Sequence, residues 1–197
     1  MNLRLALVTV LIGIATCPGC GTSPAARFYS LTSRNLDTVS QTGAAFRIAV
    51  GGVAVPEIVD RPQIVLRQGA NQVTIAEFAR WAEPLKYQVP RAIAENLTVL
   101  LNGAQVFVYP KSADVEADCQ VLLDLQRFDS TLGDAVTVEV LWTVRLAEGG
   151  KIRNGRSVVR ESISAEGYDA LVAAHARALA TVSRDIAKAI ESLRAPG

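Results

Sequence analysis

The sequence is poor in the residues that most catalytic and metal sites require. Its 197 residues include one histidine, His175, and three cysteines, Cys17, Cys20 and Cys119. One histidine and so few thiols cannot assemble a zinc site, and no Gly-x-Ser-x-Gly turn accompanies His175 to form a catalytic triad. The nucleotide-binding pattern Gly-x-x-x-x-Gly-Lys-Ser/Thr is absent too, which excludes an ATPase of that class. We therefore expect no catalytic residue, no metal site and no bound cofactor.

An excess of charge of either sign is also lacking. The chain carries 20 lysines and arginines against 19 aspartates and glutamates, and Arg4 is the only charged residue before Cys20. The chain from Cys20 onward is therefore neutral in formal charge. Such a balance does not favour a nucleic-acid partner, which requires a basic surface.

Long apolar runs are absent except near the N-terminus. Arg4 precedes an apolar run from Leu5 to Ala15, which is about half of the roughly 20 residues that a membrane-spanning helix needs. Gly19 and Cys20 follow this run closely. The segment therefore resembles the lipobox of bacterial lipoproteins, and we interpret residues 1–19 as a signal peptide that is cleaved before Cys20.

The processing site leaves two alternatives open. Cys17 occupies a position that is usually aliphatic in a lipobox, so cleavage before Cys17 competes, although it would leave Thr16 where a small residue is favoured. An ordinary secretory signal with a cysteine nearby is the second alternative. With Cys17 removed and Cys20 acylated, Cys119 has no intrachain partner, and we expect it to be buried as a small hydrophobic residue.

Acylation of Cys20 would make this residue the mature N-terminus and a membrane anchor. A diacylglycerol and an N-acyl chain on Cys20 would give a stable attachment, because each buried methylene contributes about 0.8 kcal/mol. Residues 20–26 would then form a short leash. Gly21 stands in place of the aspartate that typically retains bacterial lipoproteins at the inner membrane, so we expect the periplasmic face of the outer membrane in a Gram-negative type of envelope.

Residues 27–197 combine strand and helix patterns and predict a single α+β domain. Periodicity predicts two amphipathic helices, over residues 85–100 and 168–194, that cover one face of an antiparallel or mixed sheet. Pro90 predicts either a kink in the first helix or a helix that begins near Val89. A loop is predicted over residues 33–45, and strands over residues 27–31, 46–55, 63–67, 72–76, 105–108, 118–128, 135–146 and 156–165.

Local signals refine this arrangement. Strict alternation from Ala135 to Leu146 places Trp142 inward, in the core, and Glu139 outward. Gly149-Gly150 and Asn154-Gly155 are turn signals. The apolar residues that the alternation leaves exposed are Leu122, Leu132 and Leu141.

Two short polar stretches contain the candidate partner-contact residues. Asp60 and Arg61 lie between two predicted strands, where they either pin a loop through an Arg–carboxylate pair or contact a partner. Arg80, Trp81 and Glu83 precede the first predicted helix. Trp81 either closes the core or forms an exposed aromatic anchor for a partner or a bilayer, while Arg80 and Glu83 pair or cap the helix.

A set of short motifs follows Cys20 and spans nearly the whole mature chain. The set comprises Phe28-Tyr29-x-Leu31, Val53–Pro56, Asp60–Arg67, Arg80–Leu85, Ala94–Leu97, Tyr109-Pro110 and Phe128-Asp129. In their order and spacing, these motifs resemble those of the ABC-type transport auxiliary lipoproteins, the PqiC/YmbA-like family.

The resemblance implies a role without catalysis. It implies a lipid-anchored, periplasmic accessory subunit of an intermembrane lipid transport system, which docks the transport machine at the outer membrane. The implied partners are a protein with MCE domains and an inner-membrane ABC permease, with a homo-oligomeric ring as a further possibility. The alternative is a structural lipoprotein that assists the assembly or gating of another outer-membrane complex.

Overall fold

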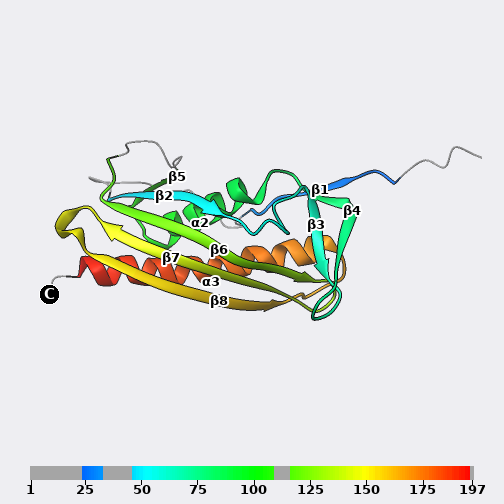
Figure 1. The fold of residues 1–197 in the computed structure, drawn as a ribbon. Coiled ribbons are helices and arrows are strands. Elements are labelled where there is room, and N and C mark those ends of the chain that lie inside the picture. The colour runs from blue at the N-terminus through cyan, green and yellow to red at the C-terminus, as the bar shows by residue number, and fades with distance from the viewer. Residues whose placement is uncertain (1–23, 33–45, 109–115, 196–197) are drawn as a thin grey trace, which may run out of the picture.

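The computed structural model describes residues 24–32, 46–108 and 116–195 (Figure 1). The predicted signal peptide, Cys20, the predicted loop over residues 33–45 and the Tyr109-Pro110 motif lie outside these ranges. Within them, the chain forms eight strands, two α-helices and one short 3-10 turn. The predicted α+β class is confirmed.

The strands form two sheets, where the sequence predicted one. The small sheet has the strand order β1-β4-β3 and the large sheet the order β5-β2-β6-β7-β8. Sequence periodicity shows which residues of a strand share a face, but not which strands pair, so the division was not predictable. The strands are β1 (Arg27–Tyr29), β2 (Arg47–Ala54), β3 (Gln63–Arg67), β4 (Val73–Trp81), β5 (Gln105–Val108), β6 (Cys119–Thr131), β7 (Ala135–Leu146) and β8 (Ile152–Ser162).

Two helices cover the inner face of the large sheet. They are α2 (Leu85–Leu100), which packs on β2 and β5, and α3 (Tyr168–Arg194), which packs on β7 and β8 (Figure 1). Burial of each large aliphatic side chain contributes about 1.5–3 kcal/mol, which explains why the apolar stripe of α3 determines its orientation. In the described ranges, no helix combines the length and apolarity that crossing a bilayer requires. The fully buried residues of the α3 stripe are Leu171, Ala174, Ala178, Leu179, Val182, Ile186 and Ile190.

The first helix begins at Leu85 and includes Pro90, so a start near Val89 is wrong. Pro84 precedes its first turn in an extended conformation, and Gly103 adopts the left-handed conformation after its end, with φ of 88°. Pro90 lies in the second turn, where it removes only one helical hydrogen bond.

The predicted alternation of β7 is confirmed on its inner side. Val136, Val138, Val140 and Val144 are fully buried, and Trp142 is 8% exposed. Glu139 lies on the outer face, as the alternation predicts, in register with the exposed Val158, but the residue is only 8% exposed. Its Oε1 accepts a hydrogen bond of 2.8 Å from Nε of Arg156 on the neighbouring strand β8.

The second predicted turn, Asn154-Gly155, is wrong, because both residues lie inside β8. Asn154 pairs with Thr143, and Gly155 pairs with Trp142 on β7. The turn between the two strands is instead the 3-10 turn η1 (Glu148–Gly150). Gly155 is required for packing, since a Cβ atom at this position would overlap the Trp142 ring.

Substitution Gly155→Ala should lower the free energy of unfolding by about 1–3 kcal/mol, because the added methyl group overpacks the core against Trp142. The matched control is Gly69→Ala, where the added Cβ has no neighbour within 4 Å. Urea unfolding of both variants measures the difference. Equal stability of the two variants would contradict the packing role of Gly155.

Candidate functional site

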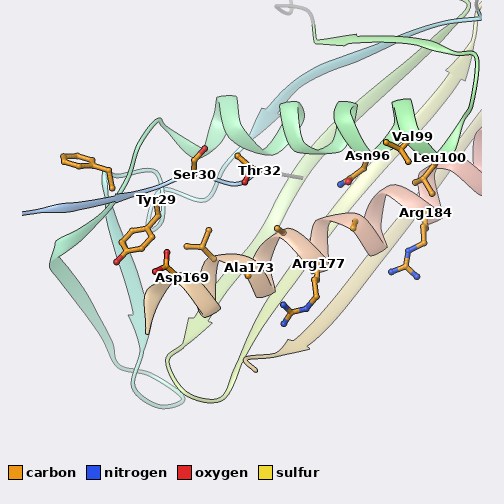
Figure 2. Close-up of a pocket in the computed structure, with 14 residues that line it drawn as sticks. Tyr29, Ser30, Thr32, Asn96, Val99, Leu100, Asp169, Ala173, Arg177 and Arg184 are labelled. Carbon is orange, nitrogen blue, oxygen red and sulfur yellow. The ribbon is translucent and has the colours of Figure 1, made fainter. Parts of the chain in front are cut away.

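An open groove of about 650 Å³ lies between the two helices. Figure 2 shows its construction: Tyr29, Ser30 and Thr32 come from β1 and the residues after it, and α2 and α3 form the two walls. The α2 wall contains Asn96, Val99 and Leu100, and the α3 wall runs from Asp169 to Arg184.

The groove combines apolar walls with a charged edge. Val99 and Leu100 of α2 are 42% and 39% exposed, and Ala173, Ala176 and Ala180 of α3 also line the groove. The side chains of Arg177 and Arg184 extend from α3 away from α2 (Figure 2).

The two arginines of this edge have different partners. Arg177 donates to the carbonyl oxygen of Ser162 at 2.7 Å and lies 3.5 Å from the Glu161 carboxylate. Arg184 donates to the Thr181 hydroxyl at 2.7 Å.

No histidine lies near the Ser30 or Thr32 hydroxyl, because His175 points from the opposite side of α3 into the core. In the described part of the chain, the groove hydroxyls therefore have no histidine beside them to act as a base.

Trp81 lies in the core, which is one of the two alternatives that the sequence left open. It is 4% exposed, and its ring centroid is 5.9 Å from that of Phe128 on β6 and 6.2 Å from that of His175 on α3. In this structure Trp81 therefore closes the core and does not present an exposed aromatic anchor.

Asp60 and Arg61 are exposed in the turn between β2 and β3. The turn is held by its backbone, since the amides of Val59 and Asp60 donate to the carbonyl oxygen of Pro56 at 3.0 and 3.1 Å. In the part of the chain that the structure describes, neither Asp60 nor Arg61 forms an ion pair, so the predicted Arg–carboxylate pair does not pin this loop.

Arg80 and Glu83 do not pair with each other, contrary to one sequence expectation. Arg80 Nε donates to the carbonyl oxygen of Glu77 at 3.1 Å, and Glu83 accepts from Arg91 at 2.7 Å on the next helical turns. No side chain caps the N-terminus of α2. The Trp81 amide donates to the carbonyl oxygen of Pro62 at 2.7 Å, which places the two predicted contact stretches side by side.

Three rings from different elements form a junction between the two sheets and α3. His175 is fully buried and stacks on Phe128, with ring centroids 3.9 Å apart and an angle of 11°. Its Nε2 lies 2.8 Å from the Ser130 hydroxyl, while Nδ1 has no hydrogen-bond partner in the described chain. Burial lowers the pKa of His175 to about 3, against a smaller opposing effect of the Asp129 charge, so His175 is neutral at neutral pH.

An ion-pair cluster lies beside this junction. Asp129 on β6 accepts from Arg67 on β3 at 3.1 Å and from Arg127 at 2.7 Å. Burial alone would raise the pKa of Asp129, but the hydrogen bonds and charges of the two arginines outweigh it and lower this pKa. The motifs Asp60–Arg67, Arg80–Leu85 and Phe128-Asp129 therefore meet at one place, where the small sheet packs on the large sheet.

Several buried polar residues of the described chain were not singled out from the sequence, Ser130 and Gln88 among them. Ser130 is 2% exposed and is the partner of His175. Gln88 is also 2% exposed, accepts from the Leu31 amide at 2.7 Å and donates to the carbonyl oxygen of Glu83 at 2.6 Å. The alternation of β6 from Cys119 to Leu125 would place Ser130 outward, and a bulge between Leu125 and Arg127 turns it inward. Nothing in the helical pattern distinguishes Gln88 from an exposed glutamine.

Comparisons with known proteins agree with this architecture. The family model for the ABC-type transport auxiliary lipoprotein component matches residues 29–187. The crystal structure of an uncharacterized protein is similar, with a TM-score of 0.67 and 22% identity over 85% of this chain and 99% of that chain. Protein XCC0632 from Xanthomonas campestris has a TM-score of 0.63 and 19% identity, over 82% and 92% of the respective chains. No curated protein matches the sequence.

Substitution Trp81→Ala should cost about 3–5 kcal/mol of unfolding free energy, because it removes a buried ring from the junction. The neighbouring substitution Phe78→Ala, at a side chain that is 47% exposed, should change stability by less than about 0.5 kcal/mol. Thermal and urea unfolding compare the pair. A Trp81→Ala variant as stable as Phe78→Ala would show that Trp81 is not a core residue.

The stability of the protein should decrease as the pH falls below about 6.5, the ordinary pKa of histidine. The unfolded chain then binds a proton at His175 that the folded chain, with a pKa of about 3, does not bind. The free energy of unfolding should therefore fall by about 1.4 kcal/mol per pH unit below this point. Urea unfolding at pH 7.5 and pH 5.0 measures the loss, and the variant His175→Gln should lack it between these values.

Proposed function

Because the chain belongs to the ABC-type transport auxiliary lipoprotein family, we propose that it is a lipid-anchored accessory subunit of an intermembrane lipid transport system. The observation that carries the proposal is the family match over residues 29–187, which includes nearly all of the described domain. Cys20 is proposed as the acylated residue, and residues 20–26 as the leash that joins the anchor to β1.

The proposed location is the periplasmic face of the outer membrane. Gly21 supports it, since an aspartate after the acylated cysteine typically retains a lipoprotein at the inner membrane. The proposed partners are an MCE-domain protein and the inner-membrane ABC permease associated with it. Several copies of the chain in a ring would give such a machine a docking surface at the far membrane.

The described structure supports a binding role over a catalytic one. The sole histidine is fully buried and neutral, so it cannot contact a substrate. The sequence predicted three exposed leucines, and all three are exposed, at 38–42%. Eleven further large apolar side chains are exposed in the described ranges, so apolar surface is available for contact with lipid or with a partner.

The test is purification of the tagged, acylated protein from its native envelope in mild detergent, with mass spectrometry of the proteins that co-purify. Recovery of an MCE-domain protein is expected, and the variant Cys20→Ala should lose both this recovery and membrane attachment. The variant Gly21→Asp keeps the acylation site and should move the protein to the inner-membrane fraction of a sucrose gradient.

Recovery of outer-membrane assembly factors in place of an MCE-domain protein would favour the structural lipoprotein over the transport subunit. An unchanged membrane fraction for Cys20→Ala would contradict the anchor itself. A Gly21→Asp protein that stays in the outer-membrane fraction would contradict the proposed sorting.

A further inference from the structure

The N-terminal leash enters the domain at the small sheet. Cys20 and Arg27 are seven residues apart, which limits the chain between them to about 25 Å when fully extended. Figure 1 shows β1 at the same end of the molecule as β3 and β4, with the C-terminal end of α3 at the opposite end. An anchor on Cys20 therefore holds the small sheet closer to the bilayer than the far end of α3.

The small sheet presents two aromatic rings and a cation on its outer side, which we call the leash-end face and define by Phe28, Phe78 and Arg80. Phe28 is 64% exposed and is the register partner of Arg80, and Phe78 lies two residues before Arg80 on β4. Ala79 and Trp81 alternate with them and point into the core, at 4% exposure each. Arg80 Nε donates a hydrogen bond to the carbonyl oxygen of Glu77, which keeps the guanidinium beside the strand.

Charge around this face is nearly balanced. Arg27 directly precedes Phe28, and Arg61 directly precedes Pro62, whose carbonyl oxygen accepts from the Trp81 amide. Both arginines are exposed, and the exposed Glu77 and Asp60 offset them. A face of this kind is attracted only weakly to an anionic surface, so its contact with a bilayer would depend on the two rings. A weak contact is sufficient for a tethered domain, because the tether makes the contact intramolecular and gives it a high effective concentration.

We propose that the leash-end face contacts the bilayer in which the acyl chains of Cys20 are inserted. The inference rests on the proposed function, since it requires the anchor at Cys20. Aromatic rings and arginine side chains favour the interface between lipid headgroups and acyl chains, where an apolar ring is buried and a cation meets phosphate. The contact orients the domain, so that the β7–β8 turn and the C-terminal end of α3 point away from the membrane toward the periplasm.

The other exposed apolar side chains lie differently. Leu122, Leu141 and Val158 are on the outer face of the large sheet, on strands that do not receive the leash. The proposal therefore predicts contact with the bilayer at the leash-end face and no contact at the outer face of the large sheet. The two faces can be compared in one experiment.

Tryptophan reporters test the proposal in the full-length, acylated protein reconstituted in vesicles of phosphatidylethanolamine and phosphatidylglycerol with brominated acyl chains. The native Trp81 and Trp142 are 4% and 8% exposed, so they give a constant background. The variant Phe28→Trp adds a reporter on the leash-end face, and Val158→Trp adds one on the large sheet, at a side chain that is 53% exposed.

Emission of Phe28→Trp should shift to the blue and fall about twofold in brominated vesicles, while that of Val158→Trp should match emission in unbrominated vesicles. Phe78→Trp reports on the same face and replaces Phe28→Trp if that variant fails to fold. Absence of quenching at both leash-end positions, or equal quenching at position 158, would overturn the proposal.

Two further outcomes separate this proposal from the proposed function. If the MCE-domain protein co-purifies but the leash-end reporters are not quenched, the transport role stands and the membrane contact is wrong. The double substitution Phe28→Ser and Phe78→Ser can also be tested for co-purification. If it abolishes co-purification while the separate reporters Phe28→Trp and Phe78→Trp are not quenched in vesicles, the leash-end face binds protein and the membrane contact is again wrong. A wild-type protein that does not float with vesicles would overturn both the anchor and the contact.

Discussion

The side-chain junction between the two sheets is the constraint on which the rest of the structure depends. In the described ranges, no strand of the small sheet pairs with a strand of the large sheet, so backbone hydrogen bonds do not join them. Side chains make this connection: His175 stacks on Phe128, the ring of Trp81 lies beside them, and Arg67 forms an ion pair with Asp129. The histidine is buried, and one of its ring nitrogens has no hydrogen-bond partner among the described residues, so the junction favours its neutral form. The position of β1, and with it the entry of the leash, therefore depends on side-chain packing.

This arrangement gives the molecule two different ends. The small sheet receives the leash and carries the exposed rings of Phe28 and Phe78, whereas the opposite end contains the β7–β8 turn and the C-terminus of α3 (Figure 1). The groove between α2 and α3 runs between these ends, and its arginines lie along one edge (Figure 2). With the anchor proposed at Cys20, the small sheet would face the membrane and the opposite end would be free for a partner.

Sequence periodicity predicted the individual elements well and their surroundings less well. The bounds of β7 and α3 are the predicted ones, because each has a long apolar pattern of a single period. Asn154-Gly155 was predicted to form a turn. Glycine is favoured in turns, but it is also favoured where a ring packs closely against the backbone, and the sequence does not distinguish the two. The Trp142 ring that explains Gly155 comes from the neighbouring strand. Glu139 lies on the outer face that its position in the alternation predicted, but its low exposure and its ion pair with Arg156 depend on a strand pairing that the sequence does not reveal.

The sequence by itself determined the helices, most strands, the buried stripe of α3 and the family, because periodicity and short motifs are properties of consecutive residues. It also determined the expectation that one histidine cannot support a metal site or a triad. Only the tertiary structure decided that the strands form two sheets, that Trp81 is a core residue and that Arg67, Asp129 and His175 meet beside it. Those facts depend on contacts between residues distant in the chain. The energy of such contacts comes from burial and from paired charges in the folded state, and no local pattern encodes it.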